Sequence, residues 1–228
     1  MPVDLQPEKV TANEQDGIGR ADKKRANATR TALIEAAERL LAEGGVRTLS
    51  LRQVNKEAGQ KNSGAIHYHF GSKEAILSAI LEKRMAVLDA ERQEALKAVD
   101  AEALSNVDLL IMLGRPLSSR VETDEGWRHY ALFAKDLSEY QNREYRPLYE
   151  GRFSAGAERI FEILRRRAGD VDERRWHENI HTSVHIGFTF VAERVQKMMP
   201  DAQKCALENL EDFLRRKARV QELILFGD

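Results

Sequence analysis

The chain has 228 residues, of which 42% are hydrophobic, so it can bury a core in one large or two smaller domains. It contains no run of the roughly 18 apolar residues that a membrane span needs. The opening residues lack the basic and apolar regions of a signal peptide, and the single Cys205 cannot form an intrachain disulfide. These features exclude a membrane protein and a disulfide scaffold, and we expect a cytoplasmic protein.

The net charge of −1 hides an uneven distribution of charged residues along the chain. Residues 20–84 contain 13 Lys and Arg but only 7 Asp and Glu, and the other residues carry the opposite sign. A basic half joined to a neutral or acidic half is typical of a DNA-binding protein with a regulatory domain. Solvated helix faces produce similar charge runs, so the excess indicates DNA binding only in combination with a structural motif.

Residues 1–27 contain Pro2, Pro7 and several acids, show no hydrophobic periodicity, and include Arg20 and the basic run 23–25 near their end. This composition predicts a disordered arm with a basic end. One hypothesis is that the basic end touches phosphates or the minor groove beside a DNA-binding helix. The alternative is a solvated tail.

The region 51–71 has the pattern of two short helices joined by a turn. Ser50 can cap a helix that begins at about Leu51, with Gln53 completing the capping box, and Gly59 can end it in the left-handed conformation. Residues 64–70 are long enough for about two helical turns and are rich in hydrogen-bonding groups, which suit phosphates and base edges. After Gly71, Ser72 can cap the next helix. This pattern predicts a helix-turn-helix with a short recognition helix.

The segment from about residue 28 to 88 resembles the amino-terminal DNA-binding domain of TetR-type transcriptional repressors. The resemblance rests on an opening helix that ends in the residues AEGG (42–45), on the helix and glycine stop of residues 48–59, on the aromatic and histidine cluster that ends in Phe70, and on the run GSKEA (71–75). It implies that one set of residues approaches base edges, namely Lys61, Asn62, Ser63, Gly64 and Ala65. It implies that a second set anchors phosphates, namely Thr48, Ser50, His67, Tyr68, His69 and Lys73.

The rest of the chain reads as successive helices, and no segment alternates long enough to predict a sheet. A first helix would pack beneath the DNA-binding unit through Leu33, Ala36, Ala37, Leu40 and Leu41. Further helices are expected near 102–114, 126–140 and 147–168, punctuated by Pro116, Pro147 and Gly169. The last two are expected at about 172–198 and 201–219, on either side of Pro200, as an antiparallel pair.

The helix near 126–140 carries an aromatic face. The plain explanation is core packing. The resemblance implies an effector cavity among the middle helices, so a mainly apolar cavity is expected to be lined in part by Trp127, His129, Tyr130 and Phe133.

The last two helices carry nearly continuous apolar stripes, and such a pair can meet its symmetry mate as a four-helix bundle. An ordinary helical hairpin inside one subunit would give the same pattern. The resemblance favours dimerisation through Trp176, Ile180, Val184, Phe188, Val191, Val195, Leu207, Leu210 and Leu214.

One motif points elsewhere, because His177-Glu178-Asn179-Ile180-His181 has the zinc-binding pattern of metallopeptidases, and His185 extends the row. It lacks a metzincin-type glycine and a supporting sheet, so a chance match is favoured over a zinc-dependent hydrolase or a metal-responsive protein. No other catalytic pattern is present, and neither an enzymatic activity nor a cofactor is expected.

These inferences combine into an all-α protein with an arm (1–27), a helix-turn-helix domain (28–85) and a helical effector-binding and dimerisation domain (86–228). The resemblance implies a homodimeric repressor that leaves its double-stranded operator when a small-molecule effector binds. The sequence identifies neither the effector nor the operator.

Overall fold

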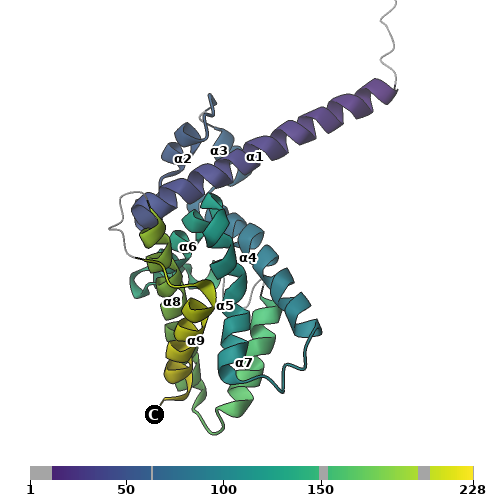
Figure 1. Ribbon diagram of the computed structural model, residues 1–228. Helices are drawn as coiled ribbons and strands as arrows, with labels where there is room; N and C mark the ends of the chain where they lie inside the picture. Colours follow the sequence, from purple (N-terminus) through teal and green to yellow (C-terminus); the bar gives the residue numbers. More distant parts are fainter. Residues whose placement is uncertain (1–11, 63, 149–153, 200–205, 228) are drawn as a thin grey trace, which may run out of the picture.

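The computed structural model describes residues 12–62, 64–148, 154–199 and 206–227, and the regular structure in these ranges is entirely helical (Figure 1). The all-α prediction is therefore confirmed. None of the described helices combines the length and apolarity needed to cross a bilayer. In chain order the elements are α1 (Ala12–Thr48), α2 (Leu51–Glu57), α3 (Ala65–His69), α4 (Lys73–Lys97), α5 (Asn106–Thr123), α6 (Glu125–Leu137), the 3₁₀ segment η1 (Tyr140–Leu148), α7 (Ala155–Arg167), α8 (Glu173–Met198) and α9 (Leu210–Phe226).

Helix α1 begins at Ala12, so the prediction of a disordered arm is wrong for residues 12–27; residues 1–11 lie outside the described part of the chain. Residues 12–27 contain no proline, so no residue of this segment removes a backbone donor from the helix, although Gly17 and Gly19 lower its intrinsic helix propensity. The amino-terminal half of α1 projects beyond the rest of the molecule (Figure 1). Its carboxy-terminal half is interrupted at Gly45, which has a φ of 74°.

Local signals set the ends of the short helices that follow. The Ser50 hydroxyl accepts a hydrogen bond from the Gln53 amide at 3.2 Å, and Gly59 follows α2 with a φ of 65°. The Ser72 hydroxyl caps α4 in the same way by accepting from the Ala75 amide at 3.2 Å. The predicted helix-turn-helix is therefore present with the expected caps.

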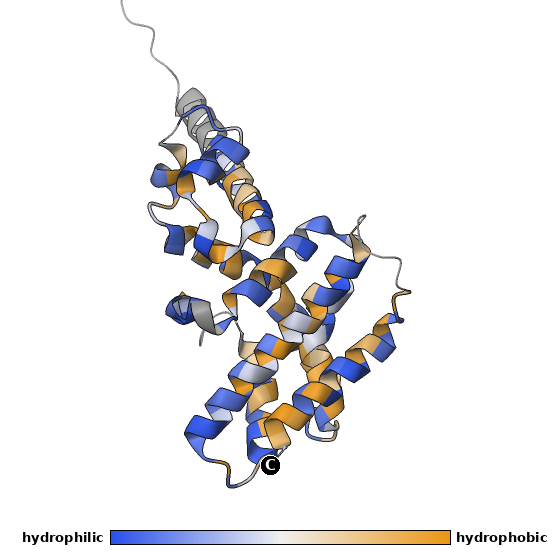
Figure 2. Ribbon diagram, turned by 90° about the vertical axis from the view of Figure 1, so that its left-hand side faces the viewer, coloured by the Kyte–Doolittle hydropathy of each residue, from blue (hydrophilic) through white to orange (hydrophobic). Residues whose placement is uncertain are grey.

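Helices α4 to α9 form a bundle, and α1 lies across the end from which α4 enters it (Figure 1). Hydrophobic residues concentrate on the faces that the helices turn toward one another (Figure 2). The predicted stripe of α1 is part of this core, since Leu33, Ala36, Ala37 and Leu41 are buried and Leu40 packs against them.

Helix α5 runs through Pro116, which the sequence analysis placed at a helix end, and this boundary is corrected. Proline removes one backbone donor and disturbs the preceding turn. Arg92 of α4 donates its Nε to the Leu113 carbonyl in that turn at 2.9 Å. A side chain from a neighbouring helix thus bonds the carbonyl next to that of Met112, which is the acceptor that Pro116 leaves without its helical donor.

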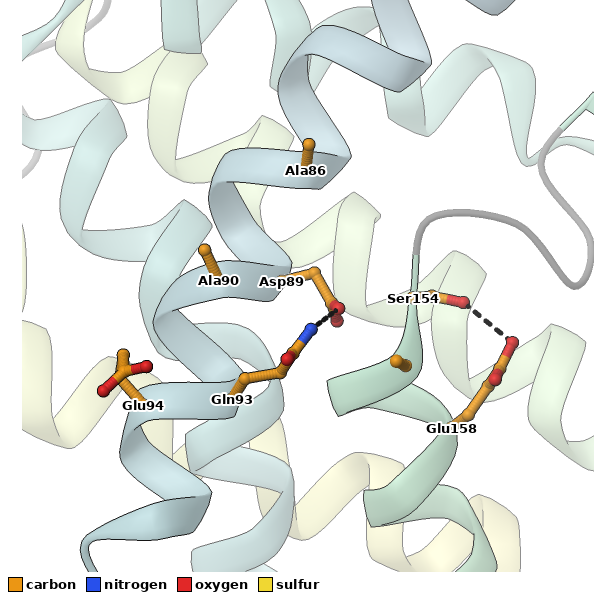
Figure 3. A pocket seen from close by; sticks show the side chains of 8 residues that line it. Ala86, Asp89, Ala90, Gln93, Glu94, Ser154 and Glu158 are labelled. Atoms are coloured by element: carbon orange, nitrogen blue, oxygen red, sulfur yellow. Dashed lines mark hydrogen bonds between the residues drawn. The ribbon is translucent and has the colours of Figure 1, made fainter.

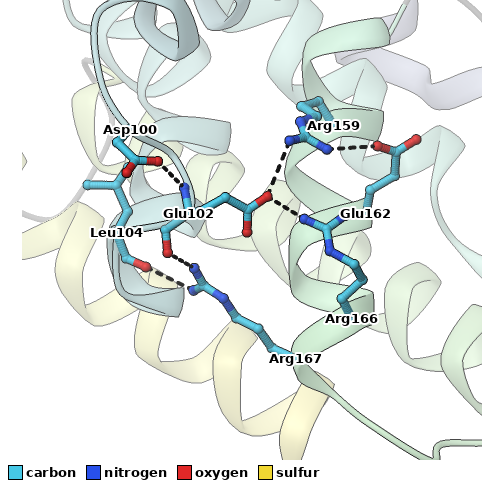
Figure 4. A network of polar contacts seen from close by, with 7 residues as sticks. All are labelled: Asp100, Glu102, Leu104, Arg159, Glu162, Arg166 and Arg167. Carbon is cyan, nitrogen blue, oxygen red and sulfur yellow. Dashed lines mark hydrogen bonds and ion pairs between the residues drawn. The ribbon is translucent and has the colours of Figure 1, made fainter.

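The loop between α4 and α5 is tied to α7 by arginines (Figure 4). Glu102 forms ion pairs with Arg159 and Arg166. Arg167 donates to the backbone carbonyls of Glu102 and Leu104, both at 2.8 Å. These contacts hold the far end of the bundle together.

Helices α8 and α9 form the predicted antiparallel pair. Trp176 near the start of α8 lies against Phe226 at the end of α9. Arg194 near the end of α8 donates to the carbonyl of Glu208, just before α9. The main stripe of α8 faces α9 and α6 of the same chain. The interface prediction is therefore corrected for four residues that are buried inside the subunit: Trp176, Val191, Val195 and Leu214. The other five are half-buried (Ile180, Val184, Phe188, Leu210) or exposed (Leu207), and Leu207 precedes α9.

Candidate DNA-binding and effector-binding sites

Helix α3 exposes a polar face to solvent and packs against the rest of the domain through one buried apolar residue. Ile66 is 1% exposed, whereas Tyr68 is 83% exposed, and Lys61, Asn62 and His67 are also exposed. The rings of Tyr68 and His69 contact each other edge to face at 5.1 Å. This exposed face has the donors, acceptors and aromatic surface that phosphates and base edges require.

Buried Asn55, which the sequence analysis missed, holds α2 and α3 together. Its amide nitrogen donates to the carbonyls of Gln60 (3.2 Å) and Asn62 (3.1 Å), and its side-chain oxygen accepts from the Ile66 amide at 3.2 Å. These three bonds satisfy backbone groups of the turn and of the start of α3. The available signal was a polar residue four positions after Leu51, on the buried side of α2.

The other predicted DNA-binding residues occupy different positions around this unit. Thr48 donates its hydroxyl to the Gly44 carbonyl at 2.8 Å, and Gly64 is the N-cap of α3 with half-buried Ala65 behind it. The ammonium of Lys73 lies 5.6 Å from the ring centre of Tyr145. Ser63 lies outside the described residues, and the DNA contacts of the whole set stay a proposal.

A carboxylate from the regulatory bundle contacts α1 at its interruption. Asp136 of α6 accepts a hydrogen bond from the Val46 amide at 2.6 Å. A Cβ atom at Gly45 would lie only 2.9 Å from the same carboxylate, and the φ of 74° independently favours glycine there. The glycine pair at the end of α1 therefore lets α6 hold the DNA-binding domain directly.

A second link joins α1 to α4 through a buried ion pair. Arg84 donates Nε and Nη2 to the two carboxylate oxygens of Glu38 at 2.6 and 2.7 Å. Its guanidinium also stacks over the ring of Trp127 at 4.5 Å, and Arg120 lies over the same ring at 4.9 Å. A bidentate buried pair has a defined geometry, so α1, α4 and α6 are held in one arrangement.

The four predicted effector-binding residues lie on α6. Trp127, Tyr130 and Phe133 are buried core residues, the ring of Tyr130 contacts the other two rings, and His129 is half-buried. Trp127 packs against Arg84 of α4, the residue that forms the ion pair with Glu38 of α1. Tyr130 instead lies within range of the charge of Arg92, and burial raises the pKa of its hydroxyl well above the ordinary value.

A surface groove of about 520 Å³ opens between α4 and the start of α7, and none of the four predicted residues lines it (Figure 3). Asp89 points from α4 toward α7, where its carboxylate accepts from the amides of Gly156 at 2.9 Å and Ala157 at 3.3 Å. Gln93 donates to the same carboxylate at 2.8 Å. Asp89 therefore forms a hydrogen-bonded wall of the groove.

The histidine row on α8 does not assemble a metal site. His177 is exposed, and His185 Nδ1 lies 3.0 Å from the Ser138 hydroxyl of α6. Across the described ranges, no three His, Cys, Asp or Glu side chains are grouped so that they could hold a metal ion. The geometry therefore gives the zinc-hydrolase reading no support.

Comparison with known families defines the class of the DNA-binding domain. Residues 33–80 match the model of the bacterial regulatory proteins of the tetR family. This match covers the helix-turn-helix and the parts of α1 and α4 that flank it, and the regular structure described beyond residue 80 is also helical.

Two solved structures illustrate the shared fold. The fatty acid degradation regulator FadR from Bacillus halodurans has a TM-score of 0.55 and 18% identity, over 87% of this chain and 95% of that one. The transcriptional regulator FadR from Bacillus subtilis, solved in complex with stearoyl-CoA, has a TM-score of 0.52 and 22% identity, over 87% of this chain and 98% of that one. No curated protein matches the chain in a sequence search.

Proposed function

We propose that the protein is a cytoplasmic, ligand-responsive repressor that binds its operator as a homodimer and is released by a small-molecule effector. The observation that carries the proposal is the exposed polar face of α3, braced by Ile66 and Asn55 in a domain that matches the tetR family. The stearoyl-CoA complex of the B. subtilis FadR supports the idea that this fold accommodates a small molecule. No catalytic step is part of the proposal.

A dimer is expected because a recognition helix of five residues reads few base pairs, whereas two copies can read successive major grooves. Apolar side chains remain uncovered on the α8–α9 pair. Leu223 is 71% exposed, and Val220, one turn earlier in α9, and Ile186 of α8 are half-buried. We place the dimer interface at these residues together with the half-buried part of the predicted set.

The proposed mechanism is a shift between two spacings of the DNA-binding domains. The contact between Asp136 and Val46 and the pair between Arg84 and Glu38 attach α1 to α6 and α4. An effector that displaces α4 or α6 would therefore move α1 with them. A preference for the displaced state of about 2.7 kcal/mol would weaken operator binding by roughly a hundredfold.

The deciding experiment is selection of duplexes from random DNA by the purified protein, followed by affinity measurements across a salt series. We expect saturable binding of a selected duplex, with Asn62→Ala changing the sequence preference and Lys73→Ala weakening binding to every duplex. Gln196→Ala, at an exposed amide of α8, is the matched control and should bind like the wild type. If no duplex is preferred over random DNA, the proposed function is wrong.

A further inference from the structure

Two cationic side chains meet inside the regulatory bundle. Lys217 of α9 is only 2% exposed, and Arg92 of α4 reaches the carbonyl of Leu113 on α5. The ammonium of Lys217 packs against the next residue of α5, Gly114, where any Cβ atom would overlap it. We call Arg92 and Lys217 the interior cation pair.

Among the described residues, Lys217 has no carboxylate partner, and Arg92 has only a long ion pair with Asp89. The Lys217 ammonium donates to the neutral side-chain oxygen of Gln221 at 3.0 Å, and an ammonium group has three donor hydrogens. Arg92 donates its Nε–H to the backbone carbonyl of Leu113, and its Nη1 lies 4.0 Å from the Asp89 carboxylate. That carboxylate already accepts bonds from the start of α7, so it only partly compensates the two positive charges.

Buried charges in proteins are ordinarily paired, because removing an ion from water costs several kcal/mol. Burial, and then the positive charge of Arg92, lower the pKa of Lys217 to about 8. The other titratable groups that act on Arg92 are the carboxylates of Asp89 and Glu91 and the hydroxyl of Tyr130, whose raised pKa keeps it neutral. The unliganded bundle therefore maintains an interior with an excess of positive charge.

We infer that the interior cation pair is the recognition point for a carboxylate group on the effector. A carboxylate can accept hydrogen bonds from a guanidinium and an ammonium at once, and its single charge would compensate the pair. Tyr130 adds a neutral hydroxyl from α6, so the ligand would contact α4, α6 and α9 together. The groove between α4 and the start of α7 is lined by Asp89 (Figure 3), and the carboxylate of Asp89 lies 4.0 Å from Nη1 of Arg92.

This inference rests on the proposed function for its consequence, release from DNA, but it can be tested apart from DNA. A purely structural role for Lys217 is the alternative, since Gln221 continues from it to the Ser183 carbonyl at 2.9 Å. The two roles differ in their effect on the unliganded protein. A structural lysine stabilises the bundle, whereas an uncompensated binding lysine destabilises it.

The first measurement is the Tm of the unliganded protein at pH 7 for the wild type, Lys217→Met and the control Lys197→Met, which changes an exposed lysine of α8. Methionine has a similar volume without the charge. We expect Lys217→Met to raise the Tm by roughly 5 °C and Lys197→Met to leave it unchanged. A lower Tm for Lys217→Met would support the structural role and overturn the inference.

The second measurement uses the wild type, so it does not depend on a variant that folds. Octanoate, benzoate and 4-phenylbutyrate are each compared with their primary amides at millimolar concentration, by Tm and by release of the selected duplex. We expect the acids to raise the Tm and release DNA more than the amides, and Lys217→Met to lose this preference. Equal effects of acids and amides, or no effect of any acid, would overturn the inference.

The two readouts separate the possible failures. A preference for acids in the Tm without binding of any selected duplex would support the carboxylate site and contradict the proposed function. Normal operator binding with no preference for acids would contradict the site alone.

Discussion

Asn55 shows how one buried polar side chain can determine the orientation of a recognition helix. Its three hydrogen bonds satisfy groups that would otherwise be unpaired next to a buried Ile66. We expect Asn55→Ala to lower the free energy of unfolding by about 2 kcal/mol and to weaken binding of the selected duplex at least tenfold. Chemical denaturation and DNA titration test this, with Gln196→Ala as control. Unchanged DNA affinity in Asn55→Ala would contradict the orienting role.

The lowered pKa of Lys217 predicts how the free energy of unfolding depends on pH. Its pKa is about 8 in the folded protein and 10.5 in the unfolded chain, so the unfolded state binds more protons between these values. Unfolding of the wild type should therefore become less favourable as pH rises from about 8 to 10.5, by about 3 kcal/mol in the ideal case.

Comparison with Lys217→Met isolates this contribution, because Tyr130 titrates in both proteins. Above pH 10 the raised pKa of Tyr130 acts in the opposite direction, since the unfolded tyrosine then loses its proton first. Urea denaturation of both proteins across this pH range is the measurement. Parallel pH profiles for the two proteins would show that Lys217 is not the responsible group.

At the scale of elements, the amino-terminal half of α1 becomes a helical extension with a basic face. Arg30 stacks over Phe70 at the end of α3 at 5.2 Å, and Lys23 lies two turns before Arg30 on the same face. We expect the double change Lys23→Ala and Lys24→Ala to reduce the slope of log affinity against log salt by about one to two. The matched double change at Lys97 and Lys197, both exposed in the regulatory domain, should leave the slope unaltered. Identical slopes for all three proteins would remove α1 from the DNA interface.

The junction of α1 with α6 is the second element to test. Asp136→Ala removes the acceptor of the Val46 amide. We expect it to lower the free energy of unfolding by about 1–2 kcal/mol and to speed hydrogen exchange of the amides at residues 46–49. Asp170→Ala, at an exposed loop position, should change neither quantity. Wild-type exchange rates in Asp136→Ala would show that α6 does not hold this part of α1.

At the scale of the whole molecule, the uncovered apolar surface of α8 and α9 should be the dimer contact. Leu223→Glu places a charge in the centre of that surface, and we expect it to shift the protein to monomer in sedimentation velocity. Val99→Glu changes a similarly exposed apolar residue in the α4–α5 loop and should leave the dimer intact. A dimer that withstands Leu223→Glu would place the interface elsewhere.

Association and DNA binding should be linked if two α3 helices read one operator. The monomeric Leu223→Glu protein should then bind a selected duplex and a half-site with similar affinity, whereas the wild type should prefer the full site. Gel-shift titration of both duplexes tests this linkage.

The helix-turn-helix could be predicted from the sequence, because the signals that define it act within a few residues. Ser50, Gly59, Gly71 and Ser72 each satisfy or end the backbone of the adjacent turn, and each lies where the pattern placed it. The all-α class follows from periodicity in the same local way.

The buried helix faces and the polar residues of the core could not be predicted in this way, because they depend on how the helices pack. Pro116 lies inside α5, where Arg92 of another helix bonds the nearby Leu113 carbonyl, and the α8 stripe faces inward because α9 and α6 of the same chain cover it. From the sequence alone, Lys217 looks like an ordinary charged residue on the surface of a helix. In the folded protein its ammonium packs against Gly114, which is distant in the chain and has no side chain to exclude it. Burial depends on partners that are distant in sequence, so the helix-turn-helix could be read locally and the interior of the regulatory domain could not.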